Sequence, residues 1–218
     1  MIKLVNLGVR YGEKVVYENF NLEIEEGKIT CVLGESGCGK TTLLNAIAGI
    51  VAHTGEIPAL TCSYIFQTPR LVPNLTVNGN LRLVCKDERR IEELIKMTGL
   101  EDKAESYPAH LSGGEKQRVS IARAFAYGGD ILLMDEPFSS LDLKLKISIM
   151  GQFKELQTKK NKTALYVTHD IDEAVFLADR IVVLRDGKVI WDIQNSEKCG
   201  YGVANSLRPA LIAKILED

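Results

Sequence analysis

The chain has few cysteines, and they form no recognisable pattern. Its 218 residues include an odd number of cysteines, with no Cys-x-x-Cys pair and no histidine at ligand spacing: Cys31, Cys38, Cys62, Cys85 and Cys199. A disulfide framework needs paired cysteines, and a structural zinc site needs ligands at short, regular spacings. The sequence therefore argues against both, and we expect reduced thiols, as in a cytoplasmic protein.

Long apolar runs are also lacking. The first ten residues, MIKLVNLGVR, do not contain the extended apolar core of a signal peptide. No later segment approaches the roughly 18 consecutive apolar residues that a membrane span requires. We expect neither feature here, so if the protein works at a membrane, another chain does the spanning.

A strong net charge is absent as well. The 27 basic and 29 acidic residues give a formal net charge of -2, and 45% of the residues are hydrophobic. This charge is too small to indicate nucleic-acid binding, and the composition is that of an ordinary globular protein. There are no internal repeats, and the length suits one domain with an embedded subdomain.

Short strand patterns alternate with helical ones along most of the chain. Residues 1–28 alternate apolar and polar side chains around two tight turns, which predicts a small antiparallel β layer. Further strands are expected at 29–33, 63–66, 131–136 and 164–168, with a hairpin at 180–193 around Asp186-Gly187. Strands that alternate with helices favour a largely parallel sheet covered on both faces.

The pattern changes between residues 68 and 126, where 77–100 and 115–128 look helical with no strand between them. We therefore expect a single domain whose α/β core comprises residues 1–67 and 127–218, with a helical insertion at 68–126. A terminal helix is expected after Pro209.

One glycine-rich stretch, GESGCGKT at residues 34–41, fits G-x-x-x-x-G-K-[ST] between a strand and a helix. In such a loop, backbone N–H groups surround phosphate oxygens and the helix N-terminus adds partial positive charge. Lys40 would reach the β- and γ-phosphates, and the Thr41 hydroxyl would ligate Mg²⁺. The residues predicted to bind nucleotide here are Gly34, Glu35, Ser36, Gly37, Cys38, Gly39, Lys40, Thr41 and Thr42.

Two acidic residues end the apolar strand ILLMDE. In open α/β sheets, ligands bind at the carboxyl ends of the strands. Asp135 is expected to hold Mg²⁺, and Glu136 to polarise the attacking water as a general base.

Two other polar residues follow strands. His169 comes directly after 164–168, and Gln67 after 63–66. A lone histidine is as readily a surface or core residue as a γ-phosphate contact, and Gln67 is only a candidate to reach the site. These alternatives stay open on the residues alone.

The stretch HLSGGEKQR at 110–118 places a second anion-binding helix start in the chain. The first loop already holds one nucleotide. The second helix N-terminus is therefore either an ordinary capped helix or half of a site that a second copy of the chain completes. In a two-fold dimer, the helix N-terminus of each copy can face the phosphate loop of the other.

These features, in this order, resemble the nucleotide-binding subunit of ATP-binding cassette (ABC) transporters over nearly the whole chain. GESGCGKT is similar to Walker A, FQ at 66–67 to the Q-loop and LSGGEKQR to the family signature; ILLMDEP is similar to Walker B, SSLD at 139–142 to the D-loop and THD at 168–170 to the switch histidine. The resemblance implies a P-loop NTPase (RecA-like) α/β core with an N-terminal antiparallel β layer and a helical subdomain that carries the signature.

The resemblance also implies roles for individual residues. Tyr11, in VRYGEK, would stack on adenine. The implied catalytic residues are Lys40, Gln67, Glu136 and His169, and the implied Mg²⁺ ligands are Thr41, Gln67 and Asp135. The residues implied to face the partner's ATP are Ser112, Gly113, Gly114 and Gln117, and Asp142 would belong to the dimer interface.

The implied system uses ATP and Mg²⁺, and a homodimer that closes on ATP. Its other members are separate membrane permease subunits and a substrate-binding protein, with this chain peripheral on the cytoplasmic face and no nucleic-acid partner. QTPRLVPNLTVNGNL resembles a segment of the nitrate, sulfonate and taurine importer ATPases, which often reads RLLPW, although Asn74 replaces that tryptophan and the signature lacks their Met-Arg. A bacterial importer of such small solutes is therefore expected.

Other systems remain open. The chain could instead power an exporter or a lipid- or lipoprotein-extraction complex, or act as a non-transport ABC ATPase. The last group usually has two cassettes or a long coiled coil, and neither is present. The short stretch 51–65 implies a trimmed β hairpin, and the end soon after residue 193 implies no regulatory domain. An exposed thiol at Cys38 would be sensitive to oxidation.

Overall fold

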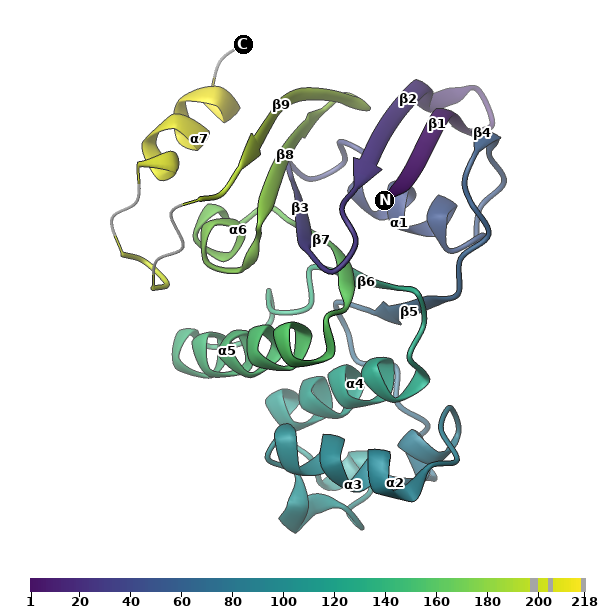
Figure 1. The fold of residues 1–218 in the computed structure, drawn as a ribbon, viewed down its shortest axis with the longest axis vertical. Coiled ribbons are helices and arrows are strands. Elements are labelled where there is room, and N and C mark those ends of the chain that lie inside the picture. The colour runs from purple at the N-terminus through teal and green to yellow at the C-terminus, as the bar shows by residue number, and fades with distance from the viewer. Residues whose placement is uncertain (197–199, 204–205, 217–218) are drawn as a thin grey trace.

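The computed structural model describes residues 1–196, 200–203 and 206–216, so Cys199 lies outside the described residues. A six-stranded sheet forms the centre of the molecule, in the order β5-β6-β7-β3-β8-β9 (Figure 1). Its strands are β3 (Ile29–Leu33), β5 (Cys62–Ile65), β6 (Ile131–Asp135), β7 (Thr163–Thr168), β8 (Arg180–Arg185) and β9 (Lys188–Gln194). All neighbours pair in parallel except β8 and β9, which form the expected antiparallel hairpin.

A second sheet of three strands lies beside the first, in the order β2-β1-β4. Its strands are β1 (Ile2–Tyr11), β2 (Lys14–Ile24) and the three-residue β4 (Thr54–Glu56). The antiparallel β layer and the mostly parallel sheet confirm the predicted fold class.

Alternation along the central strands divides the core into two layers. Val32, Leu133 and Val167 face β1, β2 and helix α1 (Lys40–Ile47), whereas Cys31 and Met134 face the remaining helices. Successive side chains of a strand point to opposite faces, so strands buried on both faces must be apolar throughout. This explains the continuous apolar runs that marked these strands in the sequence.

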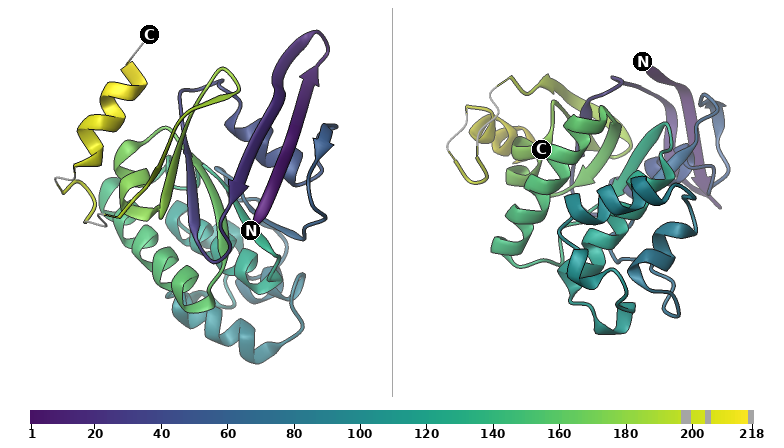
Figure 2. Two further views of the ribbon diagram at one scale, coloured as in Figure 1. Left: turned by 45° about the horizontal axis from the view of Figure 1, so that its top comes forward. Right: turned by 60° about the horizontal axis from the view of Figure 1, so that its bottom comes forward.

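Residues 77–127 form helices without a strand. They are α2 (Val77–Arg82), α3 (Glu88–Met97), the short 3-10 helices η1 (Glu101–Lys103) and η2 (Pro108–His110), and α4 (Gly113–Tyr127). The stretch 77–100 is thus two helices, not one, because Asp87 starts a new helix by accepting a hydrogen bond from Arg90 N (3.2 Å). Figure 2 shows this helical group on the side of the sheet away from β1 and β2.

Three helices cover the rest of the second layer: α5 (Leu143–Lys160), α6 (Ile171–Leu177) and α7 (Leu207–Leu216). Helix α7 begins two residues before Pro209, which stands in its first turn, where a proline costs no hydrogen bond. The Arg185 guanidinium donates to the carbonyls of Lys214 (3.2 Å) and Ile215 (2.8 Å), which joins α7 to β8.

Two buried tyrosines differ in how their hydroxyls are satisfied, and this predicts opposite effects of the same substitution. Tyr17 on β2 is 1% exposed and its hydroxyl has no hydrogen-bond partner among the described residues, whereas the Tyr166 hydroxyl on β7 donates to the Glu173 carboxylate. An unpaired buried hydroxyl costs free energy, so Tyr17→Phe should raise the free energy of unfolding by about 1 kcal/mol. Tyr166→Phe should lower it by about 2 kcal/mol. Urea denaturation measures both, and destabilisation by Tyr17→Phe would contradict the assignment.

Candidate functional site

The loops that follow three adjacent strands meet at one edge of the central sheet. Strands β6, β7 and β3 are neighbours and parallel, so their carboxyl ends share an edge. Asp135 ends β6, Thr168 ends β7, and Gly34 follows β3. Gly34 N donates to Thr168 O (3.4 Å), which joins two of these loops.

A pocket of about 420 Å³ opens at this edge. Ten of the residues that line it were predicted from the sequence: Tyr11, Ser36, Gly37, Gly39, Lys40, Thr41, Thr42, Gln67, Asp135 and Glu136. Lys14 and Val16 line it too and were not predicted. The pocket is therefore formed by segments far apart in the chain.

The glycine-rich loop bends around the head of α1. Gly39 has φ +112°, a conformation that favours glycine, and a Cβ there would lie 2.7 Å from the Tyr17 hydroxyl. The Lys40 ammonium donates to the carbonyls of Gly34 (2.8 Å) and Glu35 (2.8 Å), with its side chain only 5% exposed. A buried cation is thus held at the mouth of the loop by carbonyl oxygens, which phosphate oxygens can replace.

Thr41 and Asp135 form an oxygen pair at the base of the pocket. The Thr41 hydroxyl donates to Asp135 Oδ1 (3.0 Å). Burial raises the pKa of the Asp135 carboxyl, and the Thr41 hydrogen bond opposes this rise. Hydroxyl and carboxylate oxygens suit Mg²⁺, which binds through one or two carboxylates with water and phosphate completing its shell. Among the described residues no group of three or more His, Cys, Asp and Glu side chains could hold a metal, so a cation here would depend on such outside ligands.

The Glu136 side chain lies between Lys40 and His169. Its carboxylate lies 3.8 Å from Lys40 Nζ and 3.0 Å from His169 Nδ1. Its φ of +43° is in the left-handed region, which is uncommon for glutamate, and its N–H donates to Val167 O (3.1 Å). The strained backbone turns the side chain of Glu136 to the pocket at the end of β6.

Gln67 reaches the same edge through Ser139. Its Nε2 donates to Ser139 Oγ (3.0 Å), and that hydroxyl donates to Glu136 O (3.0 Å). The role of Ser139 as a link was not predicted, since nothing local distinguishes it from Ser140.

Tyr11 ends β1 at the rim of the pocket and is 49% exposed. Lys14 begins β2 just after the turn, and Val16 follows it on the same strand. A flat aromatic face beside an aliphatic side chain suits stacking with a heterocyclic base. Closeness to Tyr11 across the turn is the sequence signal that could have identified Lys14 and Val16.

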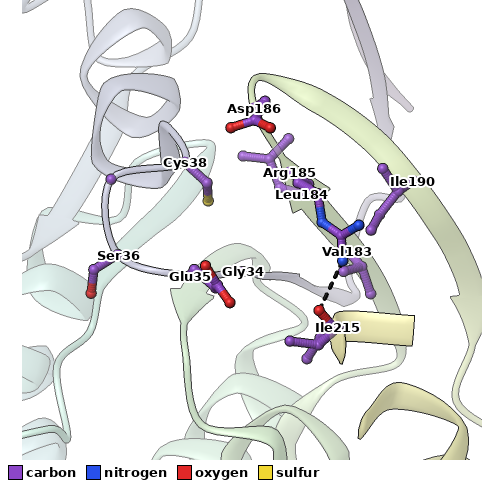
Figure 3. Close-up of a pocket in the computed structure, with 11 residues that line it drawn as sticks. Gly34, Glu35, Ser36, Cys38, Val183, Leu184, Arg185, Asp186, Ile190 and Ile215 are labelled. Carbon is purple, nitrogen blue, oxygen red and sulfur yellow. Dashed lines mark hydrogen bonds between the residues drawn. The ribbon is translucent and has the colours of Figure 1, made fainter. Parts of the chain in front are cut away.

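A second, smaller pocket of about 180 Å³ lies on the other side of the loop (Figure 3). Gly34, Glu35 and Cys38 line it, whereas none of these three lines the larger pocket. The Cys38 side chain points toward the β8–β9 hairpin, with Ile215 of α7 across the pocket. The thiol is half-buried, and burial raises its pKa.

The signature segment forms the N-terminus of α4. Ser112 caps the helix, accepting from Glu115 N (3.3 Å), while the Glu115 carboxylate accepts from Ser112 N (2.7 Å). A Cβ at Gly113 would meet no atom within 4 Å, whereas one at Gly114 would lie 2.3 Å from Leu145 Cδ2. The structure describes all of these signature residues, and none of them lines the pocket around Lys40.

The structure places two further residues of the signature and interface predictions. Gln117 is only 1% exposed in the single chain and packs inside the helical layer, so its contact with a partner's ATP stays a prediction. The helical period places it on the buried face of α4, a direction set by packing on neighbouring helices. Asp142 accepts a hydrogen bond from Leu145 N (3.1 Å) as the N-cap of α5.

No helix in the part of the chain that the structure describes combines the length and the apolar character needed to cross a membrane.

Comparisons with known proteins agree with this geometry. A family model described as ABC transporter matches residues 17–139, more than half of the chain. The chain is 42% identical over 190 residues to the aliphatic sulfonates import ATP-binding protein SsuB 3 of Paraburkholderia xenovorans (strain LB400), which covers 85% of this chain and 77% of that protein.

Other relatives carry different names. The chain is 39% identical over 209 residues to the Fe(3+) ions import ATP-binding protein FbpC of Fusobacterium nucleatum subsp. nucleatum, covering 86% of this chain and 56% of that protein. It is 38% identical over 213 residues to the spermidine/putrescine import ATP-binding protein PotA of Pasteurella multocida (strain Pm70), covering 88% of this chain and 58% of that protein. The chain therefore spans little more than half the length of these two relatives.

Solved structures share the fold. A dimeric bacterial ABC transporter cassette, MJ0796, has a TM-score of 0.78 at 35% identity, covering 89% of this chain and 99% of that one. CbiO1 from Clostridium perfringens, described as part of the ABC transporter complex CbiONQ, has a TM-score of 0.82 at 26% identity, covering 90% of this chain and 89% of that one. The predicted resemblance is confirmed: the chain belongs to the ABC transporter family, as an ATP-binding subunit.

Proposed function

We propose that the chain binds and hydrolyses ATP to drive transport through separate membrane subunits. The observation that carries this proposal is that the Lys40 loop, the Thr41–Asp135 pair and Glu136 line one pocket, with His169 in contact with Glu136 from outside the lining. A phosphate cradle, a cation site and a base with its partner are the groups that phosphoryl transfer to water requires.

Each group has a distinct part in the proposed reaction. Lys40 exchanges the carbonyls of Gly34 and Glu35 for phosphate oxygens and stabilises the charge that develops on them. Glu136 accepts a proton from the attacking water, and His169 beside it contacts the γ-phosphate. Thr41 and Asp135, with Gln67 lining the same pocket, would hold Mg²⁺, which when bound would neutralise phosphate charge.

We further propose that two copies close on two ATP molecules. The N-terminus of α4 is an anion site that the chain's own pocket does not use. A second copy related by two-fold symmetry would present Ser112, Gly113 and Gly114 to the γ-phosphate of this one, with Asp142 at the interface. ATP then favours the closed pair through contacts that ADP lacks, and hydrolysis releases it.

The domain division proposed is the one expected, with 1–67 and 127–218 as the ATPase core and 68–126 as the helical part that meets a permease. The chain would then work as a peripheral subunit on the cytoplasmic face of a membrane. Import is favoured, since relatives named for sulfonate, Fe(3+) and polyamine import are all about 40% identical to this chain. A nitrate-, sulfonate- or taurine-like solute is the cargo we propose, and an exporter remains the alternative.

ATP hydrolysis by the purified chain tests the function directly. We expect phosphate release that requires Mg²⁺ and rises more than linearly with protein concentration, because the active form is a dimer. Lys40→Met should abolish it, since the methionine keeps the buried stem but loses the phosphate contact. Hydrolysis that persists in Lys40→Met at the wild-type rate would contradict the proposal. To separate import from export, proteoliposomes with the co-purified permease should take up solute only when a binding protein is added.

A further inference from the structure

A buried cluster of charged and hydroxyl groups lies beneath the segment that carries His169, outside the pocket described above. Its members come from α5, β7, α6 and the C-terminal segment. They are Lys146, Tyr166, Thr168, Asp170, Glu173 and Tyr201.

Lys146 is the cation of this cluster and bridges two carboxylates. Its ammonium lies 2.6 Å from Glu173 Oε1 and 3.2 Å from Asp170 Oδ2, and the Lys146 and Glu173 side chains are only 12% and 2% exposed. The other Glu173 oxygen accepts from the Tyr166 and Thr168 hydroxyls, the latter at 2.9 Å. Burial lowers the pKa of Lys146, but its hydrogen bonds to both carboxylates outweigh this and raise it.

The two residues that flank His169 are both anchored in this cluster. Thr168 donates to Glu173, and its hydroxyl accepts from Asp170 N (3.0 Å). Asp170 Oδ1 caps α6 by accepting from the N–H groups of Asp172 (2.9 Å) and Glu173 (3.2 Å). His169 itself is 55% exposed, and its imidazole contacts Glu136. The position of the imidazole therefore depends on how its neighbours are held.

Removal of the ammonium would leave two carboxylates facing each other with little water, a costly arrangement that moves at least one of them. Asp170 is the more exposed of the two, at 28%, and is the residue next to His169. A shift of Asp170 would therefore carry His169 away from Glu136.

Tyr201 contacts the same carboxylate from the C-terminal segment. Its hydroxyl donates to Asp170 Oδ2 (3.2 Å), and its ring packs edge-on against Phe176 of α6. The C-terminal segment thus reaches the residue beside His169.

We propose that Lys146 is a positioning residue for the switch histidine, which it holds against Glu136 through Asp170 and Glu173, and that Tyr201 supports the same arrangement. This inference rests on the proposed ATP hydrolysis, in which His169 and Glu136 act together.

The first test separates turnover from binding. In Lys146→Met we expect kcat for ATP hydrolysis to fall about 10- to 100-fold, because a displacement of a catalytic group by about 1 Å causes a loss of this size. The KM for ATP should stay within twofold of wild type. Lys146→Arg should restore most of kcat because it keeps the charge. Lys154→Met is the matched control: Lys154 also lies on α5 and donates to α6, at Phe176 O (2.7 Å), but it is outside the cluster. Equal losses in Lys146→Met and Lys154→Met would overturn the proposal, as would an unchanged kcat in Lys146→Met.

The second test does not need activity. With labelled histidine, the ring resonances of His169, assigned with a His169→Gln variant, should shift in Lys146→Met and stay in place in Lys154→Met. An inactive wild type with this shift present would refute the proposed function alone, whereas an active wild type without the shift would refute the inference alone.

Tyr201→Phe covers the case in which Lys146→Met does not fold, since it removes one oxygen at the edge of the cluster. We expect a two- to fivefold lower kcat, an unchanged KM and a smaller shift of the His169 resonances. Resonances and kcat identical to wild type would overturn the proposal.

Discussion

Glu136→Gln should bind ATP with wild-type affinity and hydrolyse it about 1000-fold more slowly. The substitution keeps the shape and the hydrogen-bonding oxygen at the end of β6 but removes the base, and general bases contribute factors of about 100 to 10,000. Lys40, 3.8 Å from this carboxylate, retains its carbonyl contacts, so the phosphate cradle stays intact. Phosphate release under single-turnover conditions measures the loss.

The same variant should accumulate an ATP-dependent dimer, because hydrolysis no longer opens the closed dimer. Size-exclusion chromatography with light scattering should show a dimer with ATP and Mg²⁺ and a monomer with ADP. Glu155→Gln is the control, since Glu155 is an exposed acid on α5 that does not line the pocket. Hydrolysis at the normal rate in Glu136→Gln would remove Glu136 from the proposed chemistry.

Gly113→Asp should fold and bind ATP but lose at least about 100-fold in hydrolysis. A Cβ at Gly113 meets no atom within 4 Å, and an aspartate in the first turn of a helix is favourable, so stability should not fall. In the proposed dimer, the new carboxylate faces the γ-phosphate of the partner's ATP. Repulsion between these two negative charges opposes closure of the dimer. Titration with a fluorescent ATP analogue measures binding, and light scattering measures the loss of the dimer.

Two neighbours of Gly113 sharpen the test. Gly114→Ala should lower the melting temperature, because its Cβ would lie 2.3 Å from Leu145 Cδ2, and this loss arises in the monomer. Glu115→Gln keeps the capping box with Ser112 but removes one negative charge, so it should dimerise at least as well as wild type. A Gly113→Asp protein that dimerises and hydrolyses normally would show that the α4 N-terminus does not face a partner's nucleotide.

Much of the fold was predictable from short-range patterns. The strands at 131–135 and 163–168 are buried on both faces, so their continuous apolar runs predicted them. The Gly39-Lys40-Thr41 loop was predictable because its chemistry needs a fixed spacing and a backbone that only glycine adopts readily. The division of 77–100 into two helices was missed, since the capping of α3 by Asp87 competes with an otherwise continuous helical pattern.

The candidate site was predictable where a residue's position along a strand determines its direction. Asp135 reaches the pocket because it ends β6, Glu136 because it directly follows that strand, and Tyr11 because it ends β1. The directions of the Gln117 and Cys38 side chains could not be predicted, because they depend on packing against other segments. Gln117 turns into the helical layer, and Cys38 turns toward the β8–β9 hairpin.

By itself, then, the sequence of this protein determined the alternation of the main strands with helices, the phosphate loop and the acids at the end of β6, since these follow from residues close together in the chain. Only the tertiary structure decided which side chains meet across long separations. The Ser139 link to Gln67, the two faces of the phosphate loop and the Lys146 cluster under His169 all join residues from different elements. Such contacts arise from the packing of whole elements against one another, and no local pattern of residues records that packing.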